Sequence, residues 1–168
     1  PLYSSAASDV YKRQLLALRP AVIRGNASEI IALAGGQSAS KGVDARDPVQ
    51  LAEQAARDLA RAQQTVVAVT GEVDFVTDGT REVRVTGGSP LMPQVTATGC
   101  ALTAVVGAFV AVSKQDTYTA AVAALSCFGI AGRRAGALAD GPGSFAWRFL
   151  DALAALETDS LTRESPLR

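Results

Sequence analysis

Histidine is absent from this chain of 168 residues, which removes several kinds of catalytic chemistry. Histidine triads, histidine general bases and histidine metal ligands are all excluded. Only two cysteines are present, Cys100 and Cys127. Two cysteines are too few for a disulfide framework or a closed zinc site, and both fit a reducing, cytoplasmic setting.

Net charge and aromatic side chains are also in short supply. Because 16 basic residues balance 16 acidic ones, no electrostatic footprint indicates nucleic acid or an anionic membrane as a partner. Aromatic residues make up 5% of the chain, and no aromatic-plus-basic patch indicates base stacking. The apolar stretch 118–132 is shorter than the about 20 residues that a bilayer span requires, so a buried core helix is expected there.

The length and the apolar content of 48% suffice for one domain, or for part of a larger one. Residues 1–14 do not share the character of the rest of the chain and resemble the adapter-derived tails of incomplete gene models, so they are excluded from fold reasoning. The alternative is a genuine polar N-terminal tail. Residues 15–157 are then expected to form the domain, and residues 158–168 a polar, mobile tail.

The first part of this domain predicts a strand and then two helices. Asn26 or Ser28 can cap the first helix, and Asp47 can cap the second ahead of a first-turn proline. The expected order is a strand at 21–23, a helix at 29–34 closed by Gly35-Gly36, a polar loop at 37–46 and a helix from 48 to about 64. One face of this last helix is expected to be apolar, lined by Val49, Leu51, Ala52, Ala55, Ala56, Leu59 and Ala60.

The remainder predicts further strands and then helices. The run 65–70 is typical of a strand buried on both faces, while 73–77 alternates and 81–85 reads as half-exposed, with Asp78-Gly79 as a hairpin turn. The expected helices are a buried one over 101–112, one over 117–139 capped by Asp116, and an amphipathic one from Phe145 to Leu156. This order predicts an α/β fold, a mostly parallel sheet flanked by helices and carrying a β-hairpin.

The start of the helix after Val95 is a candidate anion site. Thr96 or Thr98 can cap it, while Ala97 and Gly99 are small enough for a ligand to approach the backbone. The first-turn N–H groups and the positive end of the helix dipole favour an anion, and they would also stabilise a thiolate at Cys100. An ordinary capped core helix is the alternative.

Two further segments are expected at the carboxyl ends of strands, where ligands gather in such sheets. They are Arg24-Gly-Asn-Ala-Ser-Glu29 and Thr70-Gly-Glu-Val-Asp74. An arginine, a threonine, a glutamate and a helix N-terminus form a set suited to phosphate. The usual P-loop and dinucleotide-binding glycine patterns are not in the sequence, so nucleotide binding would use another scaffold.

Four motifs in order resemble hydroxyethylthiazole kinase, a family of ribokinase-like fold that acts in thiamine biosynthesis. They are Val22-Ile-Arg-Gly-Asn-Ala-Ser-Glu-Ile30, Val69-Thr-Gly-Glu-Val-Asp74, Val95-Thr-Ala-Thr-Gly-Cys-Ala-Leu102 and Gly141-Pro-Gly-Ser-Phe145. The resemblance runs from about Leu15 to Leu156 and covers the C-terminal portion of the family. An N-terminally truncated kinase, weakly active or aggregation-prone on its own, is therefore expected.

The resemblance implies phosphorylation of the hydroxyethyl group of 4-methyl-5-(2-hydroxyethyl)thiazole by ATP, with Mg²⁺ as cofactor. It also implies a homotrimer for the intact family. Cys100 stands where many relatives of this fold carry an aspartate base. Ala97 stands where the family commonly has glycine, and a positive φ there would disfavour alanine. The other implied roles are ATP contacts from Arg24 and Thr70, backbone amides of Thr98 and Gly99 on the phosphoryl group, substrate contact at Ala97, and Mg²⁺ placement through water by Asn26 and Glu29.

Two alternatives remain open. A related hydroxymethylpyrimidine kinase also carries a segment like Thr-Gly-Cys, although Arg24-Gly-Asn-Ala-Ser argues against it. A non-catalytic nucleotide-binding fragment is the other. Each residue also has a structural alternative: a surface arginine at 24, a strand end at Thr70, a first-turn partner at Glu29, a small buried side chain at Cys100, and a helix breaker at 141–143.

Overall fold

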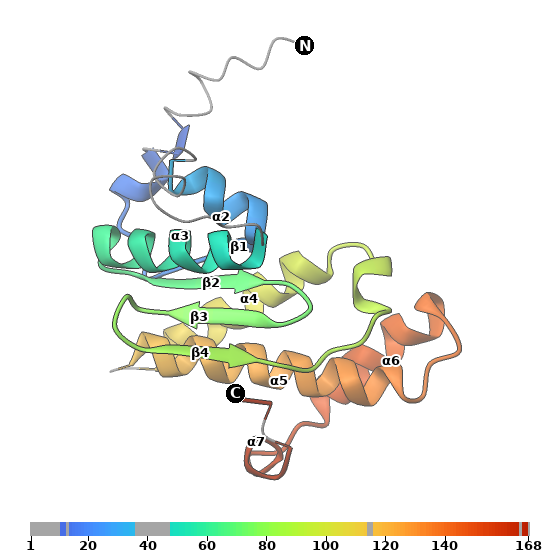
Figure 1. Ribbon diagram of the computed structural model, residues 1–168. Coiled ribbons are helices and arrows are strands. Elements are labelled where there is room, and N and C mark those ends of the chain that lie inside the picture. Colours follow the sequence, from blue (N-terminus) through green and yellow to red (C-terminus); the bar gives the residue numbers. More distant parts are fainter. Residues whose placement is uncertain (1–10, 13, 36–47, 114–115, 165, 168) are drawn as a thin grey trace, which may run out of the picture. The chain divides into compact units, whose positions relative to one another are not determined.

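From residue 22 onward the described elements run strand, two helices, three strands and then a series of helices, which is the predicted α/β order (Figure 1). The structure, a computed structural model, describes residues 11–12, 14–35, 48–113, 116–164 and 166–167. The predicted loop at 37–46 and the predicted cap at Asp47 lie outside these residues. The elements are β1 (Val22–Asn26), α2 (Ala27–Leu33), α3 (Pro48–Gln63), β2 (Val66–Thr70), β3 (Asp74–Thr77), β4 (Glu82–Val85), the 3₁₀ helix η1 (Met92–Gln94), α4 (Thr98–Val112), α5 (Thr117–Gly136), α6 (Pro142–Ala154) and α7 (Ser160–Arg163).

The four strands form one sheet in the order β1-β2-β3-β4. β1 is joined to β2 through α2 and α3, while short turns join β2 to β3 and β3 to β4. Val66–Val69 of β2 are all buried, which confirms the predicted strand with two covered faces. The chain divides into two compact units, one of residues up to Val69 with Thr77–Glu82, the other of Thr70–Val76 with residues from Val83 onward.

In the first unit, α2 packs on β1 and α3. The apolar face predicted for α3 is confirmed by five buried side chains: Ala52, Ala55, Ala56, Leu59 and Ala60. The helix ends at Gln63, and the next residue, Gln64, has a φ of 52°, the left-handed geometry common after helix C-termini. The amide of Thr65 then donates to the carbonyl of Ala60 at 3.2 Å.

The Asp78-Gly79 hairpin is confirmed, and its turn is held by side chains. Asp78 Oδ1 accepts from the amides of Thr80 and Arg81, and its Oδ2 pairs with the Arg81 guanidinium at 2.7 Å. Burial acts to raise the pKa of Asp78, but the Arg81 and Thr80 hydrogen bonds outweigh it and hold that pKa below its usual range. Gly79 supplies a φ of 90°.

The alternation predicted for 73–77 is wrong, because Phe75, Val76 and Thr77 are all buried. The polar side chain of Thr77 tolerates burial since its hydroxyl donates to the Arg81 carbonyl at 2.8 Å and accepts from the Gly79 amide at 2.9 Å. The Phe75 ring is covered by the guanidinium of Arg84, which lies 5.5 Å from its centroid.

The second unit is built around α5, against which α4, α6 and α7 pack. Asp116 caps α5 as predicted, accepting from the Thr119 amide at 3.2 Å, and the helix ends at Gly136, three residues earlier than expected for a helix over 117–139. Phe128 of α5 and Phe149 of α6 meet edge to face with ring centroids 4.7 Å apart. None of the helices in the described residues is long and apolar enough to cross a bilayer.

The prediction that α4 is buried is wrong for this chain. Within α4 only Leu102 and Val106 are buried, and Val112 is 79% exposed. The helix packs on α5 along one face, and a uniformly apolar composition does not reveal how many faces are covered. Many of its other positions carry alanine or glycine, whose small side chains cost little when exposed.

The segment after Glu157, expected to be a mobile tail, is instead anchored to the second unit. It contains α7, and Glu164 accepts hydrogen bonds from Arg133 and Arg134 of α5. The Thr86 amide donates to the Pro166 carbonyl at 2.8 Å, just beyond β4. The motif at 141–143 does not merely break a helix either: α6 begins within it, at Pro142, where proline is favoured.

Candidate active site

The candidate anion site is the first turn of α4, which is entered from η1 through Val95. Ala97 is the N-cap residue, and the first intrahelical bond runs from the Ala101 amide to the Ala97 carbonyl at 2.9 Å. The amides of Thr98, Gly99 and Cys100 precede that bond, at the positive end of the helix dipole. A helix of 15 residues with this start is suited to an anionic group.

The prediction that Thr96 or Thr98 caps this helix is wrong. The Thr98 hydroxyl points back along the chain and donates to the Val95 carbonyl at 2.7 Å. The cap position is occupied by Ala97, whose methyl side chain offers no hydrogen-bonding group. The end of the helix is therefore not closed by its own N-cap side chain, which suits a turn that receives a ligand.

Ala97 has a φ of 68° and lies in the left-handed region. This left-handed geometry disfavours alanine relative to glycine. A β-carbon in this region costs about 1–2 kcal/mol compared with glycine. The turn therefore holds strain at the residue where the chain enters the anion site.

The two cysteines have different surroundings. Cys100 is exposed, which excludes the interpretation of it as a small buried side chain. Its place in the first turn of α4 leaves the sulfur accessible to a ligand at the helix start. Cys127 is half-buried in α5, and burial raises the pKa of its thiol, so it remains a packing residue.

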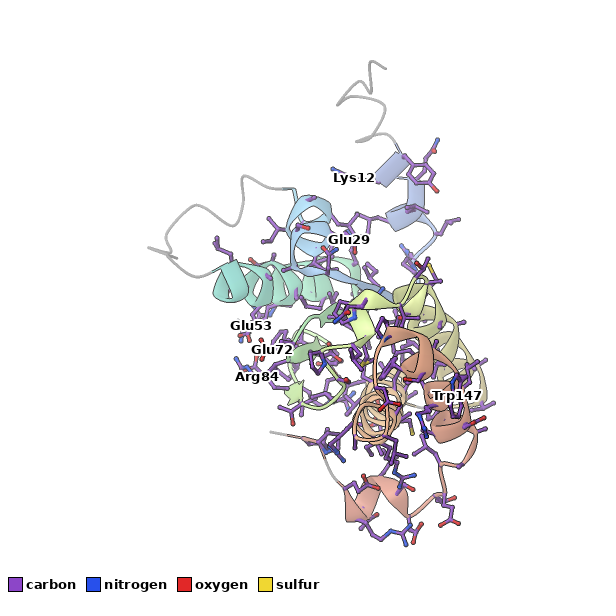
Figure 2. All side chains as sticks on the ribbon, turned by 90° about the vertical axis from the view of Figure 1, so that its right-hand side faces the viewer. Lys12, Glu29, Glu53, Glu72, Arg84 and Trp147 are labelled. Atoms are coloured by element: carbon purple, nitrogen blue, oxygen red, sulfur yellow. The ribbon has the colours of Figure 1, made fainter. Side chains whose placement is uncertain are left out.

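In the first unit, the predicted site residues gather at the junction of β1 and α2. Asn26 is the N-cap of α2 and accepts from the Glu29 amide at 2.9 Å, while Glu29 Oε2 accepts from the Asn26 amide at 2.7 Å. This capping box confirms the predicted Asn26 cap. Figure 2 shows Glu29 on α2, and its side chain is exposed.

Gly25 makes this junction compact, a role that the sequence prediction missed. A β-carbon at Gly25 would lie 3.1 Å from both Cβ and Oε2 of Glu29. Arg24, immediately before it in β1, is half-buried. The glycine in Arg-Gly-Asn was the available signal, because an interior strand glycine often marks close backbone approach.

The donor groups at this junction suit a water-bound Mg²⁺ better than a fully coordinated one. Glu29 uses one carboxylate oxygen in the cap, and its other oxygen is of the type that Mg²⁺ takes, directly or through water. Among the described residues, the structure shows no group of three or more histidine, cysteine or acidic side chains that could hold a metal ion. The donor set fits a Mg²⁺ that is held chiefly by water and phosphate oxygens.

Thr70 ends β2 and is half-buried, in the second unit. The turn after it is fixed by Asp74, whose Oδ1 accepts from the Gly71 amide at 2.9 Å. The structure therefore brings together Ala97 to Cys100 in one turn, and Arg24, Asn26 and Glu29 at one strand–helix junction.

The fold and the site thus define an α/β protein in which one helix, α4, begins at a strained residue without a side-chain N-cap. Residues 4–159 match the HK: Hydroxyethylthiazole kinase family. The chain is 63% identical over 159 residues to a hydroxyethylthiazole kinase of Rhizobium etli (strain CIAT 652), covering 95% of this chain and 62% of that protein. It is 61% identical over 160 residues to one of Gemmatimonas aurantiaca, covering 95% of this chain and 57% of the relative.

Among solved structures, the hydroxyethylthiazole kinase of Pyrococcus horikoshii OT3 superposes with a TM-score of 0.82 at 34% identity, covering 96% of this chain and 61% of that one. The predicted ribokinase-like α/β fold is thereby confirmed. The chain belongs to the hydroxyethylthiazole kinase family. It spans between 55% and 62% of the length of the curated relatives from Rhizobium.

Proposed function

We propose that this chain transfers the γ-phosphoryl group of ATP to the hydroxyethyl oxygen of 4-methyl-5-(2-hydroxyethyl)thiazole, in thiamine biosynthesis or salvage. The observation that carries the proposal is the first turn of α4 in a member of this family, with Ala97 at its cap and three amides ahead of the first helical bond. Phosphoryl transfer depends mainly on positioning and charge stabilisation, which a helix start can provide.

In the proposed reaction, the substrate hydroxyl oxygen attacks the γ-phosphorus and the bond to the bridging β–γ oxygen breaks, releasing ADP. The amides of Thr98 and Gly99 stabilise the charge on the transferring group. The sulfur of Cys100 accepts the hydroxyl proton. Since phosphoryl transfer depends mainly on positioning and charge stabilisation, the contribution of Cys100 is modest.

The remaining roles concern binding. Arg24 provides a fixed positive charge and Thr70 a hydroxyl for ATP, while Ala97 contacts the thiazole alcohol. Glu29, oriented by Asn26, would hold Mg²⁺ through water, and that ion neutralises charge on the β- and γ-phosphate oxygens when bound. The proposal includes a cytoplasmic location and a homotrimer for the intact protein.

A phosphorylation assay with ATP, Mg²⁺ and each of two alcohols tests the proposal. Turnover of the thiazole alcohol is expected, at a low rate because α4 leaves much apolar surface exposed. Turnover of hydroxymethylpyrimidine alone would show that the pyrimidine alcohol, and not the thiazole alcohol, is the substrate. ATP binding without turnover of either alcohol would indicate a non-catalytic nucleotide-binding module.

Variants at Cys100 test its assigned role. Cys100→Ala should lower kcat by about tenfold with little effect on KM, because proton acceptance matters in the transition state and phosphoryl transfer depends mainly on positioning. Cys100→Asp should retain more activity than Cys100→Ala, since a carboxylate can also accept that proton. Cys127→Ala is the matched control and should leave kcat unchanged. Equal kcat values for Cys100→Ala and the parent would remove Cys100 from the mechanism.

A further inference from the structure

The chain after β4 runs along α5 before it reaches the first turn of α4, the candidate anion site (here called the anion-binding turn) (Figure 1). Its backbone is hydrogen-bonded to that helix: the Gly88 amide donates to the Gly129 carbonyl at 2.8 Å. Gly88 has a φ of 82°, which glycine adopts freely and other residues rarely do. Gly88 therefore lies directly against the backbone of α5.

Two glycines of α5 leave no room for a β-carbon beside the segment Gly88–Met92, and a third does. A β-carbon at Gly132 would lie 2.7 Å from Met92 Sδ and 3.0 Å from Gly88 Cα. A β-carbon at Gly136 would lie 2.7 Å from Ser89 Cβ, with Ser89 Oγ closer still. At Gly129 the nearest atoms would be 3.6 Å away, which is ordinary van der Waals contact.

A continuous series of hydrogen bonds leads from this segment to the anion-binding turn. The Met92 amide donates to the Ser89 carbonyl at 3.0 Å, and the Val95 amide donates to the Met92 carbonyl at 3.2 Å. The Thr98 hydroxyl then donates to the Val95 carbonyl at 2.7 Å. A displacement of Ser89 or Met92 is therefore transmitted through η1 to the residue that starts α4.

We infer that Gly132 and Gly136 are positioning residues for phosphoryl transfer. Their missing side chains let Gly88–Met92 approach α5 closely, and this approach fixes the direction in which the chain enters the turn at Ala97. Neither glycine touches substrate. The inference rests on the proposed function for its catalytic consequence, while its structural part concerns the first turn of α4 alone.

Gly136→Ala tests the inference, with Gly129→Ala as the matched control on the same helix. A misplacement of about 1 Å can cost on the order of 100-fold in rate, so Gly136→Ala should lower kcat by about 10–100-fold. Gly129→Ala should stay within about twofold of the parent, since its β-carbon meets only ordinary contacts. Ser89→Gly added to Gly136→Ala removes both clashing atoms and should restore most of kcat.

A second readout reports the turn itself, without turnover. Hydrogen exchange at the Ala101 amide measures the first hydrogen bond of α4, and exchange at the Phe145 amide measures the equivalent bond in α6. Gly136→Ala should accelerate exchange at Ala101 about tenfold or more while Phe145 stays unchanged. A general loss of stability would instead accelerate hydrogen exchange at both amides.

Two results would overturn the inference. The first is exchange at Ala101 equal in Gly136→Ala and Gly129→Ala. The second is loss of kcat that Ser89→Gly does not restore. If Gly136→Ala does not fold, Gly132→Ala with and without Met92→Ala gives the same comparison at the neighbouring contact. If the parent shows no turnover, the proposed function fails, and exchange at Ala101 still decides whether α5 positions the turn.

Discussion

Asn26 and Glu29 hold each other across the first turn of α2. Asn26 Oδ1 accepts from the Glu29 amide at 2.9 Å, and Glu29 Oε2 accepts from the Asn26 amide at 2.7 Å. The pair therefore already has a structural role before any ion binds. A test of the proposed Mg²⁺ role has to separate the capping function of Glu29 from its charge.

Glu29→Gln and Glu29→Ala make that separation. Glutamine retains an oxygen for the Asn26 amide, so Glu29→Gln should leave the unfolding free energy nearly unchanged, whereas Glu29→Ala should lower it by about 0.5–1 kcal/mol. Both variants should raise the Mg²⁺ concentration needed for half-maximal turnover, because both lack the carboxylate charge. If Glu29→Gln shows an unaltered Mg²⁺ titration, the metal role is excluded.

Ala97→Gly should stabilise the protein and keep the anion turn intact. The left-handed φ of 68° costs alanine about 1–2 kcal/mol relative to glycine, and the greater freedom of glycine in the unfolded chain offsets part of that gain. The expected net increase is about 0.5–1 kcal/mol in unfolding free energy. Urea unfolding measures it.

Ala101→Gly is the matched control for that variant, one turn further along the same helix. It lies in regular helix, where glycine lowers stability by about 0.5–1 kcal/mol relative to alanine. The two substitutions should therefore change the urea midpoint in opposite directions. A decrease for both would show that the backbone at Ala97 is not left-handed in solution.

Glu164 gives the C-terminal anchor a pH dependence. Hydrogen bonds from Arg134 and then Arg133 hold the pKa of its carboxyl below the usual 4.5. A carboxyl with a lowered folded-state pKa contributes stability above its unfolded pKa, and loses it as the pH falls through the folded value. The contribution is thus present at neutral pH and disappears below about pH 4.5.

Glu164→Gln should therefore lower the melting temperature at pH 7, and the difference in melting temperature from the parent should shrink as the pH falls below about 4.5. The matched control is Glu157→Gln, whose carboxylate pairs with Arg163 but is 74% exposed. Exposed pairs of this kind contribute little, so the control should follow the parent at every pH. A difference in melting temperature between Glu164→Gln and the parent that stays constant as the pH falls would contradict the stabilising role of the Glu164 carboxylate.

The parts of the fold that could be predicted from the sequence depend mostly on interactions between residues close together in the chain. The Asn26 cap, the Asp116 cap, the apolar face of α3 and the Asp78-Gly79 turn each depend on residues within a few positions of one another, and each is confirmed. The errors concern tertiary surroundings. The composition of α4 does not show that only one of its faces packs on α5. The polarity of Glu164 does not show that its carboxylate accepts hydrogen bonds from Arg133 and Arg134 of α5.

The candidate site divides along the same line. The amides at Thr98 and Gly99 could be expected from a glycine-containing helix start, and the family motifs implied their role. The position of Ala97 as the N-cap residue could not be predicted, because the threonines on either side of it are better N-cap residues by local preference. The Thr98 hydroxyl donates instead to the Val95 carbonyl, a contact that local N-cap preference does not reveal.

Amide chemical shifts during titration with ATP test the central claim most directly, since they show where the phosphates bind without requiring turnover. The account predicts that the largest shifts occur at Thr98, Gly99 and Cys100. The starts of α5 and α6, which are equally exposed to helix-dipole effects, serve as controls in the same spectra and should change little. Largest shifts at Thr117–Thr119 or at Gly143–Phe145, with the first turn of α4 unchanged, would contradict the assignment of the anion site.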